Sequence, residues 1–167
     1  MKLLKTTLVA LVLIVTTASC TKDETQVVEE ANFGIDVNLA METDWQMADE
    51  ILTLVNEYRT SIGLSALKRD QQYASAYAVD HTQYMIDISK INHDNFGVRS
   101  KALKDRGAQS VGENVAMGYT KAENLVNAWL NSPSHRGVIE GNYTHSGFGV
   151  IQNDRGIYYF TQLFYRK

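Results

Sequence analysis

Apolar residues recur at helical spacing through the first two thirds of the chain. The segment 45–62 gathers its apolar side chains on one side of a helix, Thr43 or Asp44 can cap its start, and Gly63 stands where a helix would stop. Residues 70–90 contain neither glycine nor proline and carry a second apolar stripe. We therefore predict two long helices, of which the second is the longer.

Shorter helices are predicted further along the chain. The spacing of apolar residues favours one over 99–106, closed by Gly107, and another over 121–130. Ser132 followed by Pro133 predicts the start of one more helix, because serine is a good N-cap and proline costs no hydrogen bond at the first helical position.

The last third of the chain contains short stretches that suit strands. We predict strands over 111–117, 146–152 and 157–164. Residues 153–156 are turn formers, so the last two strands should make an antiparallel hairpin. Helices that cover a small antiparallel sheet make a layered α+β domain.

The composition is that of an ordinary globular chain. Of its 167 residues, 44% are hydrophobic and 21% are charged, which excludes collagen-like and disordered classes. The single cysteine cannot form an internal disulfide. A formal net charge of −3 gives no electrostatic reason to expect nucleic acid as a partner, and we predict none.

The first 20 residues have the pattern of an export signal. Two lysines precede the apolar run 8–15, which is far shorter than the roughly 20 residues that a bilayer-spanning helix needs, so we predict a signal peptide over 1–19. Residues 17–20 look like a bacterial lipobox, which implies cleavage before Cys20, lipidation of its thiol and a membrane anchor. The alternative is a plain secretory peptide with an incidental cysteine.

An acidic tether is predicted over 20–47, ahead of a domain over 48–167. Residues 20–50 carry nine acidic side chains against one basic side chain, Lys22. Charge runs of this kind are usually solvated segments. Residues 21–24 also resemble the export signal of bacterial surface lipoproteins, so we expect a cell-envelope lipoprotein at the outer membrane, exposed at the surface.

The predicted strand 111–117 carries a first candidate functional residue. Alternation places Glu113 on one face with Val111, Val115 and Met117, so a carboxylate lies among apolar neighbours. A buried carboxylate shifts its pKa, finds a partner or binds a cation. The alternatives are an exposed face on a short edge strand and a structural salt bridge.

The four histidines have different surroundings. His93 lies in a polar loop segment, and His135 is predicted in the first turn of a helix, whose dipole favours the neutral imidazole that metal ligation or proton acceptance requires. His81 lies on the apolar side of the long helix, which indicates a core histidine. His145 opens a strand.

Common catalytic motifs do not occur in the sequence. There is no HExxH, GxSxG, P-loop, CxxC or glycine-rich dinucleotide pattern, so the enzyme classes that these motifs mark are unsupported. His93, His135 and Glu113 together permit an open zinc site without establishing one.

Six short motifs occur in order along residues 49–166. They are LVNEYR (54–59), HD (93–94), GENVA (112–116), WLNSPSHR (129–136), GFGV (147–150) and YFTQLF (159–164). In order and spacing they resemble the bacterial branch of the CAP superfamily (cysteine-rich secretory proteins, antigen 5 and pathogenesis-related proteins), also called SCP-like domains.

The resemblance implies a three-layer α-β-α sandwich with a cleft built around histidines and glutamates. Carried over by motif, His93, Glu113 and His135 match three of the usual four cleft residues, with the histidines as metal ligands and Glu113 as the candidate catalytic residue. Ser132 stands where eukaryotic members place the fourth, a glutamate. Glu123 lies in the helix before it, without a motif match.

Bacterial relatives commonly carry an acidic residue where this chain has His145, so we expect an added imidazole near the cleft. The resemblance also implies an exported domain that binds an extracellular protein, lipid or glycan. Our first hypothesis is a non-enzymatic binding domain whose cleft can hold zinc or another divalent cation.

Two further hypotheses come from other functional classes. The chain could be a metal-dependent hydrolase of peptides or esters, with zinc on His93 and His135 and with Glu113 positioning or deprotonating water. It could instead bind an apolar ligand in an aromatic groove. The rings in question are those of Tyr143, Phe148, Tyr158 and Tyr159, for which the alternative is a place in the core.

Overall fold

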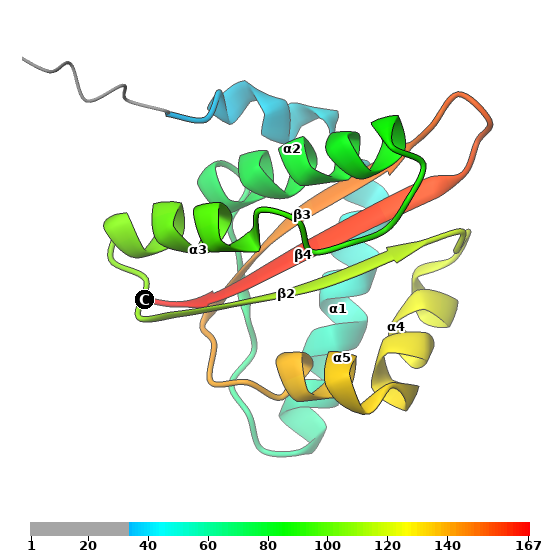
Figure 1. The fold of residues 1–167 in the computed structure, drawn as a ribbon. Helices are drawn as coiled ribbons and strands as arrows, with labels where there is room; N and C mark the ends of the chain where they lie inside the picture. Colours follow the sequence, from blue (N-terminus) through cyan, green and yellow to red (C-terminus); the bar gives the residue numbers. More distant parts are fainter. Residues whose placement is uncertain (1–33) are drawn as a thin grey trace, which may run out of the picture. The chain divides into compact units, whose positions relative to one another are not determined.

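The computed structural model describes residues 34–167, which form one compact unit. The predicted signal peptide over 1–19, the predicted lipidation site at Cys20 and the tether up to residue 33 lie outside the described residues. Helices and strands mix in this unit, which confirms the α+β prediction (Figure 1). The elements are the 3-10 helix η1 (Val37–Glu42), α1 (Trp45–Ser61), β1 (Lys68–Arg69), α2 (Tyr73–Asp87), α3 (Phe96–Asp105), β2 (Ser110–Met117), α4 (Ala122–Asn131), α5 (Pro133–Ile139), β3 (His145–Gln152) and β4 (Tyr158–Arg166).

The sheet has four strands in the order β1-β3-β4-β2. The predicted hairpin of β3 and β4 is present, and β2 pairs antiparallel with β4. β1 instead runs parallel to β3, through Lys68 and Arg69, so the sheet is mixed rather than purely antiparallel. A strand of two residues is too short to show a pattern, and the partners of β1 lie far along the sequence in β3. For these reasons β1 could not be predicted. The order places β2 at an edge of the sheet.

Helices cover both faces of the sheet (Figure 1). α1, α4 and α5 lie on one face, and η1, α2 and α3 lie on the other. β2 contacts both α3 and α5, so the two helical layers approach each other at this edge. This three-layer arrangement is the one that the resemblance implied.

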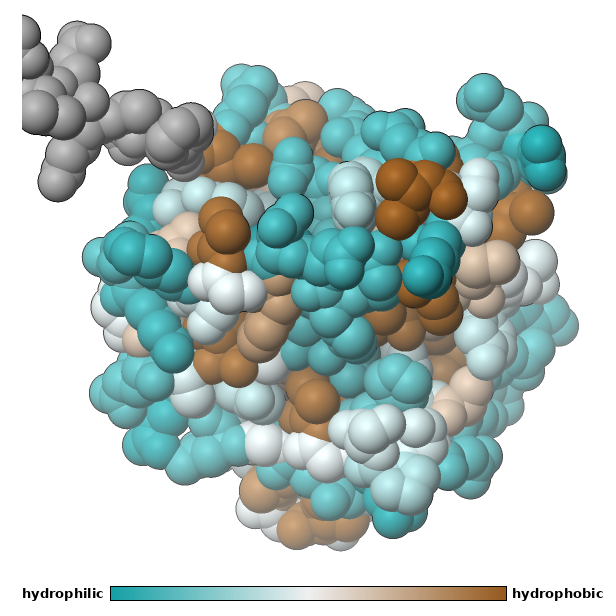
Figure 2. All heavy atoms as spheres, in the orientation of Figure 1, coloured by the Kyte–Doolittle hydropathy of each residue, from teal (hydrophilic) through white to brown (hydrophobic). Residues whose placement is uncertain are grey.

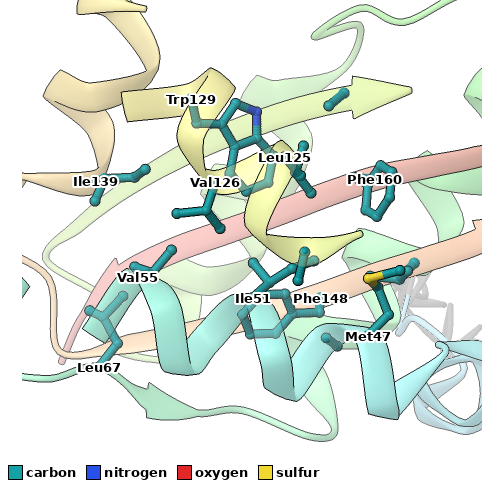
Figure 3. Packing of buried hydrophobic residues seen from close by; sticks show 14 of the residues in the cluster. Met47, Ile51, Val55, Leu67, Leu125, Val126, Trp129, Ile139, Phe148 and Phe160 are labelled. Carbon is teal, nitrogen blue, oxygen red and sulfur yellow. The ribbon is translucent and has the colours of Figure 1, made fainter. Parts of the chain in front are cut away.

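The larger core lies between the sheet and α1 with α4. In Figure 3 side chains from these two helices point toward those of β3 and β4. Its fully or nearly fully buried members include Ile51, Val55, Leu125, Val126, Trp129, Ile139, Phe148 and Phe160. Strand alternation decides which side chains of β4 enter this core. Phe160 and Phe164 face the layer of α1 and α4, while Tyr159 and Leu163 face the opposite layer.

α2 packs unusually close to β3, and two glycines make this possible. A Cβ atom on Gly147 would overlap the backbone of Ala74, and one on Gly149 would overlap the carbonyl of Ala78. Thr82, one turn on, donates its hydroxyl to Ala78 O at 2.8 Å. The two glycines of the GFGV motif are therefore required for close packing of β3 against α2, the helix that carries His81.

The predicted helices form, with shifted ends. The prediction that the second is the longer is wrong, since α1 has 17 residues and α2 has 15. Asp44 caps α1 by accepting the Met47 N–H at 3.1 Å. α2 starts later than predicted because Asp70 accepts the backbone N–H groups that follow it. α3 starts earlier than the predicted residue 99, directly after Asn95, whose φ of 57° turns the chain into the helix.

The folded unit begins before the predicted domain boundary at residue 48. In the described part of the segment that we assigned to the tether, Ala40 is buried, and the Thr43 hydroxyl donates to Phe148 O at 2.8 Å. The Asp44 N–H donates to Val150 O at 2.9 Å. These bonds join the segment to β3, so residues 34–47 are part of the domain.

The aromatic residues proposed to line one groove do not do so. Phe148 is 1% exposed and packs in the core beneath α1, whereas Tyr159 is 3% exposed and packs with Met85 and Val115 on the opposite face. The face seen in Figure 2 is largely hydrophilic, with its hydrophobic residues in separate patches. The core alternative for these two rings is therefore the correct one.

Candidate functional site

Glu113 lies at the centre of a buried polar cluster on the edge strand β2. Its side chain is 1% exposed, and Val111 and Val115 share its face of the sheet, under α2 and α3. The predicted burial of a carboxylate among apolar neighbours is confirmed. Such a group needs partners, because an unpaired buried charge is costly.

Arg99 of α3 supplies the main partner. Its Nε donates to Glu113 Oε2 at 2.7 Å and its Nη2 donates to Oε1 at 2.9 Å, with 4% of the arginine side chain exposed. The two parallel bonds are the strong bidentate form of this pair. The remaining nitrogen, Nη1, donates to the backbone carbonyl of Asp94 at 2.7 Å. Arg99 therefore joins the carboxylate to the loop before α3.

His93, in that loop, is the second partner. Its Nδ1 lies 2.8 Å from Glu113 Oε1, while 53% of the histidine side chain is exposed. An ionised carboxylate only accepts hydrogen bonds, so Nδ1 must carry the proton. In the neutral ring the other nitrogen, Nε2, is then an acceptor.

The carboxyl group of Glu113 is held in its ionised form. Burial raises its pKa, but the hydrogen bonds from His93 and Arg99, together with the arginine charge, outweigh burial and leave the pKa below its usual value. At neutral pH the cluster is therefore a carboxylate fully enclosed by donors.

His81 of α2 supports the same loop from behind. Its Nε2 lies 2.8 Å from the carbonyl oxygen of Asn92, and its ring stacks on Tyr84, whose hydroxyl donates to Asp94 at 2.9 Å. Burial, followed by the charge of Arg99, lowers the pKa of His81. The prediction of a buried, hydrogen-bonded histidine is confirmed, and this histidine also positions the residues next to His93.

His135 approaches the cluster from the other helical layer. The Asn114 amide, fully buried on the opposite face of β2 from Glu113, donates to the His135 carbonyl at 3.1 Å. Burial, followed by the charge of His93, lowers the pKa of His135. The neutral ring is favoured, as predicted, but burial rather than the helix dipole is the main cause. The charge of His93 therefore acts on His135 across the edge of the sheet.

The other predicted site residues have different places. Ser132 stands at the N-cap position of α5, but its side chain makes no capping bond and instead lies 3.1 Å from the Ser134 hydroxyl. Glu123 is exposed in the first turn of α4 and lines a cavity of about 530 Å³ with Asp49 and Glu50 of α1.

His145 is not an added imidazole in the cleft. It stacks on Tyr165 with ring centroids 5.0 Å apart, at the start of β3, and its Nδ1 lies 2.8 Å from the Thr144 hydroxyl. Burial, followed by the charges of Lys68 and Lys167, lowers its pKa. The expectation fails because β3 enters the sheet two strands away from β2.

Arg99 is the residue that sequence reasoning missed. An arginine inside a predicted helix normally indicates an exposed position, and no motif marked it. The signal was indirect: a buried Glu113 requires a compensating cation, and nothing in the sequence says which one.

The cluster does not fit a zinc centre in which Glu113 takes part. Within residues 34–167 no group of three or more His, Cys, Asp or Glu side chains is arranged to hold a metal ion. Both oxygens of Glu113 already accept hydrogen bonds, and the fixed positive charge of Arg99 lies beside them. Glu113 instead forms a structural salt bridge, which was one of the alternatives that the sequence left open.

Curated relatives resemble the chain over most of its length. It is 35% identical over 125 residues to the uncharacterized membrane protein YlbC of Bacillus subtilis, covering 71% of this chain and 34% of that protein. It is 30% identical over 109 residues to the uncharacterized protein YkwD of the same organism, covering 62% and 42%. The chain thus spans less than half the length of these relatives. Within residues 34–167 no helix is long and apolar enough to cross a membrane.

Solved structures share the fold. An outer surface protein of Borrelia burgdorferi has a TM-score of 0.64 at 24% identity and covers 73% of this chain and 93% of its own. An extracellular SCP-domain protein of Bacillus anthracis has a TM-score of 0.59 at 28% identity, covering 75% and 44%. The model of the cysteine-rich secretory protein family, CAP, matches residues 52–164. With the layered fold and the six motifs already described, this match establishes that the chain belongs to the CAP family.

Proposed function

We propose that this protein is a non-enzymatic binding domain, held at the outside of the cell, that recognises an extracellular partner through the surface around His93 and His135. The observation that carries the proposal is that both oxygens of Glu113 are buried and already hydrogen-bonded. Its two oxygens accept three hydrogen bonds, two from Arg99 and one from His93. The one carboxylate of the cluster is used to hold the fold.

The same observation argues against the hydrolase hypothesis. A general base needs an accessible oxygen and a pKa near the working pH. Glu113 is buried and its pKa is lowered rather than raised. No third protein ligand accompanies His93 and His135 in the described residues, so the water-activating zinc that the hypothesis requires has no matching site.

The part of the cluster that remains accessible to a partner is the ring of His93. His93 is about half exposed, yet its ring orientation is fixed by Glu113, and its loop is held by Arg99 and His81. A side chain that is fixed before binding loses little conformational entropy on contact. This favours recognition of a partner over chemistry on it.

Turnover measurements test the non-enzymatic proposal. We expect the full chain to turn over no substrate in a panel of peptides, esters and glycans, with or without added zinc. Turnover that Glu113→Gln and His93→Gln both abolish would overturn it. His93→Gln serves as the second variant because its side chain is exposed and its loss leaves the Arg99 pair intact.

The binding part of the proposal has its own readout. The ring protons of His93 and His135 report ligand contact by NMR in the full chain. We expect phospholipid vesicles, soluble cell-wall glycan or a peptide mixture to shift these two resonances while leaving those of His145 unchanged. If none of the three probes moves them, recognition by this surface is rejected.

We further propose that a lipid on Cys20 anchors the domain to the envelope, at the outer membrane and facing outward. The names of the structural relatives, an outer surface protein and an extracellular protein, support an exported location. Labelling cells with a palmitate analogue should mark the chain, and Cys20→Ala should release it into the medium. A labelled Cys20→Ala variant, or an unlabelled chain of wild-type sequence, would contradict the anchor.

A further inference from the structure

A concave site lies at the end of α3 that is remote from the His93 cluster. It is a cavity of about 900 Å³, bounded by η1, the loop before α2, the end of α3, the start of β3 and the end of β4. In Figure 1 the start of α2, the end of α3 and the end of β4 meet on the same side of the domain. α3 has 10 residues, about 15 Å of helix, so the cavity and the His93 cluster lie at opposite ends of one element.

In the described part of the chain, two cations of this cavity have no ion-pair partner. Arg106 and Lys167 line it, both are exposed, and neither side chain belongs to an ion pair among residues 34–167. The third lining cation, Arg69, differs, since it donates twice to Asp49, at 2.6 and 2.7 Å.

The one carboxylate side chain of the lining is already committed. Asp70 accepts the backbone N–H groups of Gln72 and Tyr73 on Oδ1, and it accepts the Ala74 N–H and the Tyr165 hydroxyl on Oδ2. It therefore caps α2 and does not pair with Arg106 or Lys167. One guanidinium and one ammonium group remain free to meet an anion.

Much of the remaining lining is aromatic and apolar. The Arg106 guanidinium lies 3.6 Å from the centroid of the Tyr73 ring, which holds the cation at the wall. The ring of Tyr165 stacks on His145 and forms a buried part of the wall, 6% exposed, whereas Val37 and Met41 of η1 are 43% and 79% exposed. The cavity thus combines cations with flat rings and uncovered apolar side chains.

We propose that this cavity binds a small organic anion, in which a phosphate or carboxylate group is attached to a flat or apolar body. Arg106 and Lys167 bind the charged group, and Tyr73, Tyr165 and η1 contact the body. The volume lies within the range of about 300–1,000 Å³ common for ligand sites. The site is independent of the recognition surface proposed above, because it shares no residue with it.

Calorimetry on the purified full chain tests whether the cavity recognises both the charged group and the flat or apolar body of the ligand. Phenyl phosphate carries both the anion and the ring, inorganic phosphate carries the anion alone, and phenol carries the ring alone. We expect phenyl phosphate to bind at least about tenfold more tightly than either fragment, and to weaken as sodium chloride is raised.

Charge-removing variants locate the binding. Arg106→Gln and Lys167→Gln should each weaken phenyl phosphate binding about tenfold, because a hydrogen bond to a charged group is lost in each. Lys104→Gln is the matched control, since it removes one exposed charge from the same helix outside the cavity. Binding that is absent at millimolar phenyl phosphate, or that all three variants weaken equally, would overturn the proposal.

The source of the anion is resolved by one further probe. Dihexanoyl phosphatidic acid, used below its micelle concentration, offers the same charged group on a lipid body. Binding tighter than phenyl phosphate and sensitive to Arg106→Gln identifies a lipid headgroup. Weaker binding with the same sensitivity identifies a free aryl or alkyl phosphate, and insensitivity of both probes to Arg106→Gln rejects the site.

Discussion

The two ends of α3 carry similar side chains in opposite electrostatic conditions. At the start of the helix, Arg99 is buried, and its charge is balanced by Glu113 at 2.7 and 2.9 Å. Just after the end, Arg106 is exposed and lies on an aromatic ring, with no carboxylate paired to it in the described residues. Both positions are arginines at one short helix, yet one charge is used inside the fold and the other is left at a cavity.

The difference shows how to separate structural from binding residues in this domain. A charge whose hydrogen-bonding capacity is filled by the protein stabilises the fold and has little left for a ligand. A charge held in place but left unpaired keeps that capacity for a partner. By this measure Glu113 of the family motif GENVA is a structural residue, whereas Arg106 belongs to the proposed ligand site at the end of α3.

The largest loss of stability should come from breaking the Arg99–Glu113 ion pair at the start of α3. Glu113→Gln leaves the buried charge of Arg99 without compensation, so we expect a loss of about 3–5 kcal/mol of unfolding free energy. Urea unfolding followed by circular dichroism measures it. The double variant Arg99→Met with Glu113→Leu should recover most of the loss. Glu123→Gln is the neutral control, because Glu123 is exposed in the first turn of α4. A loss below about 1 kcal/mol for Glu113→Gln would contradict the assignment.

Acid should remove part of the same stabilisation. Because the pKa of Glu113 is lower in the folded state than its ordinary value of 4.5, its contribution is present above that pH and is lost as pH falls through the folded pKa. The difference in unfolding free energy between the original chain and Glu113→Gln should therefore shrink below about pH 4.5. A difference that stays constant between neutral and strongly acidic pH would show that ionisation of Glu113 does not matter.

Removing the exposed partner should cost less. His93→Ala deletes one hydrogen bond to Glu113 but leaves both bonds from Arg99, and the imidazole is half exposed. We expect a loss of about 1 kcal/mol, by the same urea unfolding assay. A loss as large as that of Glu113→Gln would mean that His93, not Arg99, holds the carboxylate.

Substitution of Arg106, just after the end of α3, should reduce stability even less. Arg106→Gln removes a cation–π contact at an exposed position, and we expect a change of about 0.5–1 kcal/mol or less in unfolding free energy. Thermal melts alongside Lys104→Gln give the comparison. Severe destabilisation would show that Arg106, like Arg99, is used inside the fold, and would undo the contrast between the two ends.

Zinc should have no measurable effect on stability. Both oxygens of Glu113 are hydrogen-bonded, and no group of three metal-ligating side chains occurs in the described residues. We therefore expect the same melting temperature with and without equimolar zinc, at about pH 7.5 and at about pH 5.5. A rise at the higher pH that weakens at the lower one and disappears in both His93→Ala and His135→Ala would instead establish these histidines as ligands, since only unprotonated imidazoles bind metal.

Much of the fold could be predicted because its signals are local. The apolar stripe of α1, its cap at Asp44 and the turn residues of the β3-β4 hairpin each lie within a few positions of the structure that they specify. Burial of Glu113 was also predictable, since strand alternation needs no information from elsewhere. By contrast, β1 and the packing of residues 34–47 depend on partners in β3, so local patterns were silent about them.

Periodicity and motifs along the chain predicted the layered class of the domain, its family and the candidate site residues His93, Glu113 and His135. What those residues do follows from tertiary packing. The fold brought Arg99 onto Glu113, placed His145 two strands away, and left Arg106 unpaired beside a cavity in the described part of the chain. The physical reason is that an ionisable side chain acts according to which charges and donors enclose it, and that enclosure exists only once distant segments pack together.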